Sequence, residues 1–152
     1  MSPRKKRLNL RVLLKLAEKY RLEAEKCLEA RAYLAGLVSV RAALEAMLYS
    51  RLLVGILDWS AKELRKFGIT VRNEVVELPE ETRLWELIEE AHKARCLDRT
   101  GFAAATRIRK WGNKIHCAEV AGGTRLPSIS RRNLEARLDD LDVVIEQIGN
   151  SL

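Results

Sequence analysis

Apolar residues recur every three to four positions through most of the chain, which is the spacing of amphipathic helices. From Leu8 to Val54 there is no proline and only one glycine, and the pattern predicts two long helices over about 9–29 and 32–55. Nothing between them breaks the chain strongly, so one continuous helix is the alternative. Two antiparallel helices agree better with the usual length of helices in globular domains.

Shorter elements follow in the middle of the chain. Ser60 and Glu63 match a capping box, which predicts a short helix that Gly68 ends. The β-branched residues of 69–78 predict an extended segment that we expect to be too short for a sheet. Pro79 suits the first turn of a further helix, which reaches about Cys96. The predicted core face of that helix consists of Leu84, Trp85, Leu87, Ile88 and Ala91.

Two more helices complete the prediction. One runs over about 100–118, and after a glycine-rich loop Ser130 caps a last helix over about 131–148. We therefore expect an all-α chain that folds as a single helical bundle of about five to six helices. The bundle domain should cover residues 9–150, and residues 1–8 should form a basic tail.

Composition and cysteine usage narrow the class of protein. Hydrophobic residues make up 47% of the chain and charged residues 32%, a balance typical of folded globular domains. The three cysteines, Cys27, Cys96 and Cys117, show no paired spacing, so we expect no disulfide framework, no metal site and no cofactor. No apolar run is long enough for a membrane span. We expect a cytoplasmic protein that does not contact a membrane.

The net charge of +7 favours polyanionic partners such as RNA, DNA or acidic proteins. The densest basic stretch lies at residues 4–7, and its simplest interpretation is a solvated tail. Charge alone therefore indicates a class of partner and no particular site.

The helix over 100–118 has one face that neither core packing nor solvation explains. Its core stripe consists of Ala104, Ile108, Trp111 and Ile115, and its solvated stripe, the predicted nucleic-acid contact, consists of Arg107, Lys110 and Lys114. A third sector carries Arg109, Asn113 and His116 within two turns, so one ligand can touch all three. Gly112 lies in the same sector, where a glycine costs about 0.8–1 kcal/mol relative to alanine. We expect another backbone or a ligand to approach closely there.

The string over 108–116 resembles the arginine, spacer, histidine motif of the HEPN superfamily. It is most similar to a branch whose motif reads arginine, two residues, Gly-Asn, two residues, histidine. Arg109, Gly112, Asn113 and His116 match that motif in register.

A second stretch, over 33–45, resembles the second helix of the same branch, in which an arginine precedes Ala-x-Leu-Glu. Arg41 and Glu45 occupy the matching positions. The resemblance implies a helical bundle that dimerises through its motif helix. Many members of the superfamily are metal-independent ribonucleases in toxin–antitoxin, restriction or antiviral systems. The implied partners are a second copy of the chain, RNA, and a cognate antitoxin or nucleotidyltransferase.

The resemblance also implies roles for the motif residues. Arg109 would bind the scissile phosphate, His116 would act as general base or general acid, and Asn113 would orient His116 or the phosphate. Arg41, Glu45 and Gly112 would support the site, although Glu45 could instead form an ion pair with Arg41.

Some interpretations stay open. Lys110 follows Arg109 at a position where active members often have a small polar residue. The alternative function is therefore a non-catalytic module for dimerisation or for binding nucleotide or nucleic acid, accessory to a defence system. His92 is expected at the surface. We expect core or interface positions, with base stacking as a lesser alternative, for Trp59, Trp85 and Trp111.

Overall fold

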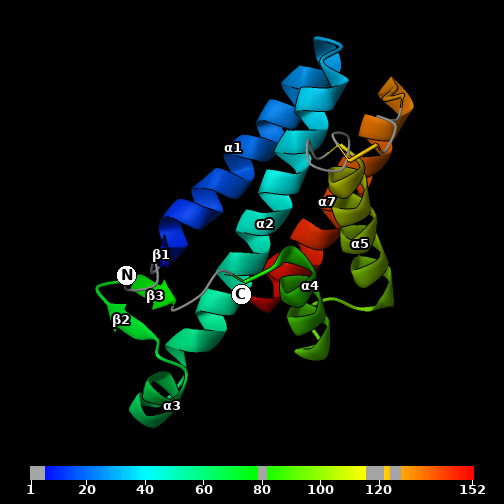
Figure 1. The fold of residues 1–152 in the computed structure, drawn as a ribbon. Helices are drawn as coiled ribbons and strands as arrows, with labels where there is room; N and C mark the ends of the chain where they lie inside the picture. The colour runs from blue at the N-terminus through cyan, green and yellow to red at the C-terminus, as the bar shows by residue number, and fades with distance from the viewer. Residues whose placement is uncertain (1–5, 79–81, 116–121, 124–127) are drawn as a thin grey trace.

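The fold is seen in a computed structural model, which describes residues 6–78, 82–115, 122–123 and 128–152. Within these ranges four long helices dominate the structure (Figure 1). They are α1 (Leu10–Glu29), α2 (Tyr33–Leu57), α5 (Arg99–Lys114) and α7 (Arg131–Ser151). Two shorter helices are α3 (Ala61–Lys66) and α4 (Leu84–Lys93). The predicted helical bundle is confirmed.

The first two long helices are separate and lie antiparallel, side by side (Figure 1). Arg31 adopts a positive φ of 59° at the junction. Its N–H donates to the carbonyl of Leu28, and the next N–H, that of Ala32, donates to the carbonyl of Cys27. This hydrogen-bond pattern is a Schellman motif, which ends α1 without a glycine. The alternative of one continuous helix is therefore wrong.

The core is built around α2. This helix contacts α1 on one side and α4, α5 and α7 on the others. Its buried residues lie around most of its circumference, so it needs partners on several sides to remove them from water. Among the fully buried side chains are Leu44, Leu53, Leu134 and Leu141.

A small antiparallel sheet lies at one end of the α1–α2 pair (Figure 1). Its strands are β1 (Lys6–Asn9), β2 (Thr70–Arg72) and β3 (Val75–Leu78), in the order β1-β3-β2. Two expectations are therefore wrong. The segment 69–78 does contribute two strands to a sheet. Residues 6–8, predicted as part of a solvated tail, belong to the strand β1.

The sheet exists because a third strand joins a hairpin that would be marginal alone. Asn73 and Glu74 both adopt positive φ, as a tight two-residue hairpin turn requires. The register then pairs Lys6 with Leu78 and Asn9 with Val75. The N-terminal segment is thereby tied to the middle of the chain.

The predicted helix ends are largely confirmed. The capping box of Ser60 with Glu63 is present, and Gly68 follows α3 at a positive φ of 66°. Ser130 caps α7, which continues three residues beyond the predicted end. α4 begins at Leu84, so the expectation that Pro79 lies in its first turn is wrong. The predicted end of α5 near residue 118 lies outside the described residues.

One residue of the predicted α4 face is misplaced. Leu87, Ile88 and Ala91 are buried as expected, but Trp85 is 41% exposed. Trp85 lies in the first turn of α4, away from the stripe that meets the core. Its assignment to the core is wrong.

None of the described helices is both long enough and apolar enough to cross a lipid bilayer.

Candidate functional site

An open cleft with a volume of about 540 Å³ lies between α2, α4 and α5. We call it the arginine cleft. It is lined by Arg41, Glu45, Thr82, Arg83, Leu84, Trp85, Arg109 and Asn113. Four residues singled out from the sequence, two on α2 and two on α5, therefore meet in one place.

The start of α5, the helix that carries Arg109 and Asn113, is tied to α7 by hydrogen bonds. The carboxylate of Asp98 accepts a hydrogen bond from the N–H of Gly101 at 2.8 Å and another from Nε2 of Gln147 at 2.9 Å. The bond from Gly101, followed by that from Gln147, lowers the pKa of Asp98 from its ordinary value. Since Arg109 and Asn113 are four residues apart, both project from the same side of this anchored helix.

Gly112 is explained by the side chain of Arg41. A Cβ atom on Gly112 would lie 2.6 Å from Cδ and 2.7 Å from Nη1 of Arg41. The glycine therefore lets Arg41 lie directly against the backbone of α5. The expected close approach is present, but the group that makes it is a side chain of α2, where we had expected a backbone or a ligand.

The cleft has an excess of positive charge. Three arginines, Arg41, Arg83 and Arg109, surround the single carboxylate of Glu45. Within the described part of the chain, no hydrogen bond or ion pair engages the side chains of Arg41, Arg109 or Asn113, and the ion pair between Arg41 and Glu45 is not formed. Half-buried guanidinium groups in this state are suited to binding an anion.

The rim of the cleft at α4 is anchored by a chain of hydrogen bonds. Lys6 Nζ donates to the hydroxyl of Tyr49 at 2.9 Å, and that hydroxyl donates to the carbonyl of Thr82 at 3.1 Å. The N–H of Arg83 donates to the carboxylate of Glu86 at 2.8 Å. The strand β1 thus helps to position the start of α4.

Sequence reasoning missed Thr82 and Arg83 as cleft residues. They lie in no motif, and no periodic pattern connects them with α5. Only the packing of α4 against α2 brings them to the cleft.

Arg107, expected to contact nucleic acid, faces another helix. Its Nη2 donates to Oδ1 of Asp140 on α7 at 2.7 Å, and its Nε lies 3.1 Å from Oδ2. This hydrogen bond raises the pKa of Arg107. Asp140 is only 7% exposed and also has Nε of Arg137 2.8 Å from its Oδ2. Arg107 is therefore engaged within the fold, although 48% of its side chain remains exposed.

The other two basic residues of the predicted nucleic-acid face are exposed. Lys110 projects into solvent, and Lys114 Nζ lies 4.6 Å from the ring centroid of Trp111. Trp111 itself is half-buried and packs against the core. These lysines leave a positive surface next to the arginine cleft.

The chain has two histidines, His92 and His116. His92 is exposed, as expected; its Nδ1 lies 2.9 Å from the carbonyl oxygen of Leu97 and its ring centroid 4.7 Å from that of Phe102. His116, the motif histidine, lies outside the described residues.

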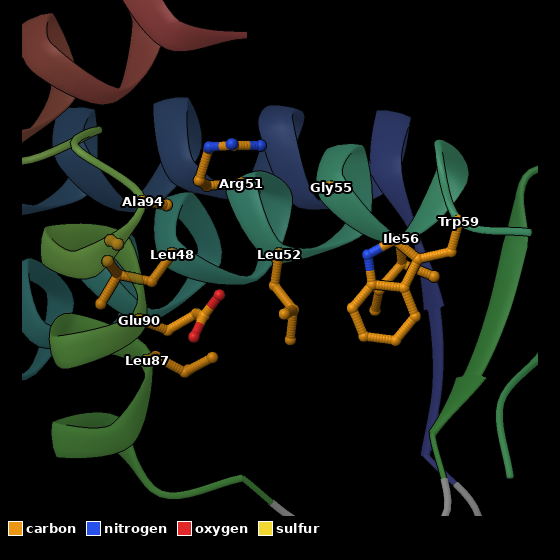
Figure 2. A pocket seen from close by; sticks show the side chains of 10 residues that line it. Leu48, Arg51, Leu52, Gly55, Ile56, Trp59, Leu87, Glu90 and Ala94 are labelled. Carbon is orange, nitrogen blue, oxygen red and sulfur yellow. The ribbon is translucent and has the colours of Figure 1, made fainter. Parts of the chain in front are cut away.

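A second hollow, which we call the apolar groove, lies between α2, α3 and α4. Figure 2 shows one part of it, a cavity of about 60 Å³ whose lining includes Leu52 and Ile56 of α2 and Leu87 of α4. A neighbouring hollow of about 730 Å³ shares several of these lining residues and includes Trp59 and Phe67, whose ring centroids are 5.3 Å apart. Its lining is mainly aliphatic and aromatic, so it offers no arrangement of polar groups comparable with the arginine cleft.

Cysteines and acidic residues form no metal centre among the residues that the structure describes: no group of three or more candidate ligands is found there. Cys27 and Cys96 are buried as free thiols. Burial raises the pKa of Cys27. Both thiols therefore belong to the packed interior.

No family model and no curated protein matches the sequence, and no solved structure matches the fold.

Proposed function

We propose that the arginine cleft binds an RNA phosphodiester and that the protein is a metal-independent endoribonuclease of the HEPN type. The observation that carries this proposal is the meeting of Arg41 from α2 and Arg109 from α5 in one open cleft. A guanidinium presents a planar fork of donors that suits the oxygens of a phosphate. Two such groups, left without a partner among the described residues, favour a phosphate ligand.

In the proposed reaction Arg109 binds the non-bridging oxygens and stabilises the charge that develops on them. The 2′-hydroxyl loses its proton and its oxygen bonds to phosphorus, while the bond from phosphorus to the 5′ oxygen breaks. The products are a 2′,3′-cyclic phosphate and a 5′-hydroxyl. We assign the proton transfers to His116, because an imidazole with an ordinary pKa of about 6.5 can act as base or acid near neutral pH.

The other cleft residues support this chemistry. Arg41 supplies a second cation beside the phosphate, and Gly112 allows its close approach to α5. Asn113 orients His116 or the phosphate through its amide. Glu45 lines the same cleft, where its carboxylate can align a guanidinium.

The resemblance extends the proposal to partners. We propose a cytoplasmic homodimer formed through α5, which would supply two copies of Arg109 and His116 to one cleft. The wider role would be in toxin–antitoxin or antiviral defence, with an antitoxin or nucleotidyltransferase as partner. Sedimentation of the purified chain as a monomer at all concentrations would contradict the dimer.

The deciding experiment is RNA cleavage in the presence of EDTA. We expect the wild-type chain to cleave RNA and leave cyclic phosphate ends, and we expect Arg109→Ala and His116→Ala to lose cleavage by about 100-fold or more. Arg131→Ala and His92→Ala are matched controls, because Arg131 pairs with Glu135 on the surface of α7 and His92 lies outside the cleft. Circular dichroism verifies that every variant is folded.

Two results would contradict the ribonuclease. Cleavage that survives in both motif variants would place the activity elsewhere or in a contaminant. Absence of cleavage in the wild-type chain, together with RNA binding that Arg109→Ala removes, would support the non-catalytic alternative. Lys110 beside Arg109 fits that alternative.

A further inference from the structure

Trp85 differs from the other two tryptophans of the chain. Trp59 and Trp111 are half-buried and pack against the core, whereas Trp85 is 41% exposed, is not part of that packing and lines the arginine cleft. Hydrophobic burial stabilises a protein in proportion to the apolar area removed from water. Core packing therefore does not account for an aromatic side chain at this position.

The backbone that carries Trp85 is held in place. The carbonyl of Thr82 is tied to Tyr49 on α2, and the N–H of Arg83 is capped by Glu86. Trp85 follows directly in the first turn of α4. The indole is therefore presented from an anchored support, which lowers the entropy lost when a ligand packs against it.

Trp85 shares the cleft with three arginines and one carboxylate, that of Glu45. Arg83 lies two residues before Trp85 on the same rim, and Arg41 and Arg109 line the same cleft. In a nucleotide chain each phosphate is joined through one sugar to a base. A phosphate bound by the arginines thus places a base within reach of the rim.

We propose that Trp85 stacks on a base of the bound strand and makes the arginine cleft selective for unpaired nucleotides. This inference rests on the proposed function for the identity of the strand as RNA. An indole face accepts any base, because every base has a π-face. In a duplex both faces of an internal base are covered by its neighbours, so only an unpaired segment can stack on Trp85. Trp85 is thus a specificity-determining residue and takes no part in proton transfer.

The test measures binding without cleavage. Short labelled oligoadenylates with 2′-O-methyl groups cannot form the cyclic phosphate, and their binding is followed by fluorescence anisotropy. Three ligands are compared: the single strand, the same strand with abasic sites, and its duplex. We expect the wild-type chain to prefer the single strand.

The variants separate stacking from phosphate binding. We expect Trp85→Ala to weaken single-strand binding by about 5- to 150-fold, the range for loss of one stacked base, and to leave abasic binding unchanged. Trp85→Phe should restore most of the affinity. Phe67→Ala is the matched control, because Phe67 is an exposed aromatic residue in the apolar groove, outside the arginine cleft. It should bind as the wild type does.

The outcomes distinguish this inference from the proposed function. Equal binding by Trp85→Ala and wild type, with Arg109→Ala weakened on every ligand, would overturn the stacking role and leave the phosphate site standing. Single-strand binding by Trp85→Phe that is as weak as that by Trp85→Ala would also overturn it. So would equal losses of affinity for the abasic and intact strands in Trp85→Ala. Binding of the abasic strand that is unchanged in Arg109→Ala would instead overturn the proposed function.

Discussion

Arg107 and Arg109 lie two residues apart on the same helix and have opposite surroundings. Arg107 meets a nearly buried carboxylate, Asp140 of α7. Arg109 faces the arginine cleft and has no hydrogen bond or ion pair with another described residue. Two helical steps turn the side chain by about 200°, so one arginine reaches α7 and the other reaches the cleft between α2 and α4. The comparison shows that the neighbouring helix, more than the residue type, determines what an arginine does.

The same contrast shows where the charge of the chain remains available. Asp140 engages both Arg107 and Arg137, so two arginines share one carboxylate at the contact between α5 and α7. The arginine cleft has three arginines and one carboxylate. An anionic ligand is therefore attracted more strongly to the cleft than to the other side of α5.

The largest effect on stability is expected where the arginines are paired. Asp140→Ala leaves Arg107 and the mostly buried Arg137 without their carboxylate, and we expect it to lower the free energy of unfolding by about 2–3 kcal/mol. Urea unfolding followed by circular dichroism measures this loss. Asp142→Ala is the matched control on the same helix, because Asp142 is half-exposed and pairs with Arg21 at the surface. Its expected cost is below about 1 kcal/mol, and a similar loss in both variants would contradict the special role of Asp140.

The next effect concerns ligand binding, for which Arg109 should matter and Arg107 should not. We expect Arg109→Ala to weaken single-strand RNA binding by about tenfold and to reduce the slope of log K against log salt by about 0.7, the value for one lost phosphate contact. Arg107→Ala should leave this slope unchanged. Titrations at several salt concentrations measure both quantities. Equal changes of slope in the two variants would remove the distinction between them.

The smallest effect tests the contact between Arg41 and α5. Gly112→Ala forces the Arg41 side chain to move, and we expect RNA binding to weaken by about three- to fivefold, a fraction of one charged hydrogen bond. The melting temperature should change little, because the gain in helix propensity of about 0.8–1 kcal/mol offsets the displacement. Gly149→Ala is the control, since a Cβ there meets no atom within 4 Å. It should raise stability and leave binding unchanged, and unchanged binding in Gly112→Ala would show that the position of Arg41 is unimportant.

Much of the helical architecture follows from local patterns in the sequence. The predicted helices over 9–29 and 32–55 agree closely with α1 and α2. The capping box at Ser60 is also present. The meeting of Arg109 and Asn113 on one face follows from their spacing alone. These features depend on interactions within a few residues, so they can be predicted from a short stretch of the sequence.

The rest was decided by contacts between distant segments. The sequence predicts a basic tail for the segment that forms the strand Lys6–Asn9. The strand forms because β3, which is distant in the sequence, provides the partner for its backbone hydrogen bonds. The sequence predicts a core position for Trp85, but the packing of α4 places it in the lining of the cleft. The approach of Arg41 to Gly112 depends on how α2 crosses α5. The sequence by itself determined the helices and their faces, because helical hydrogen bonds are local; only the tertiary structure decided which faces meet, because that depends on packing between segments far apart in the chain.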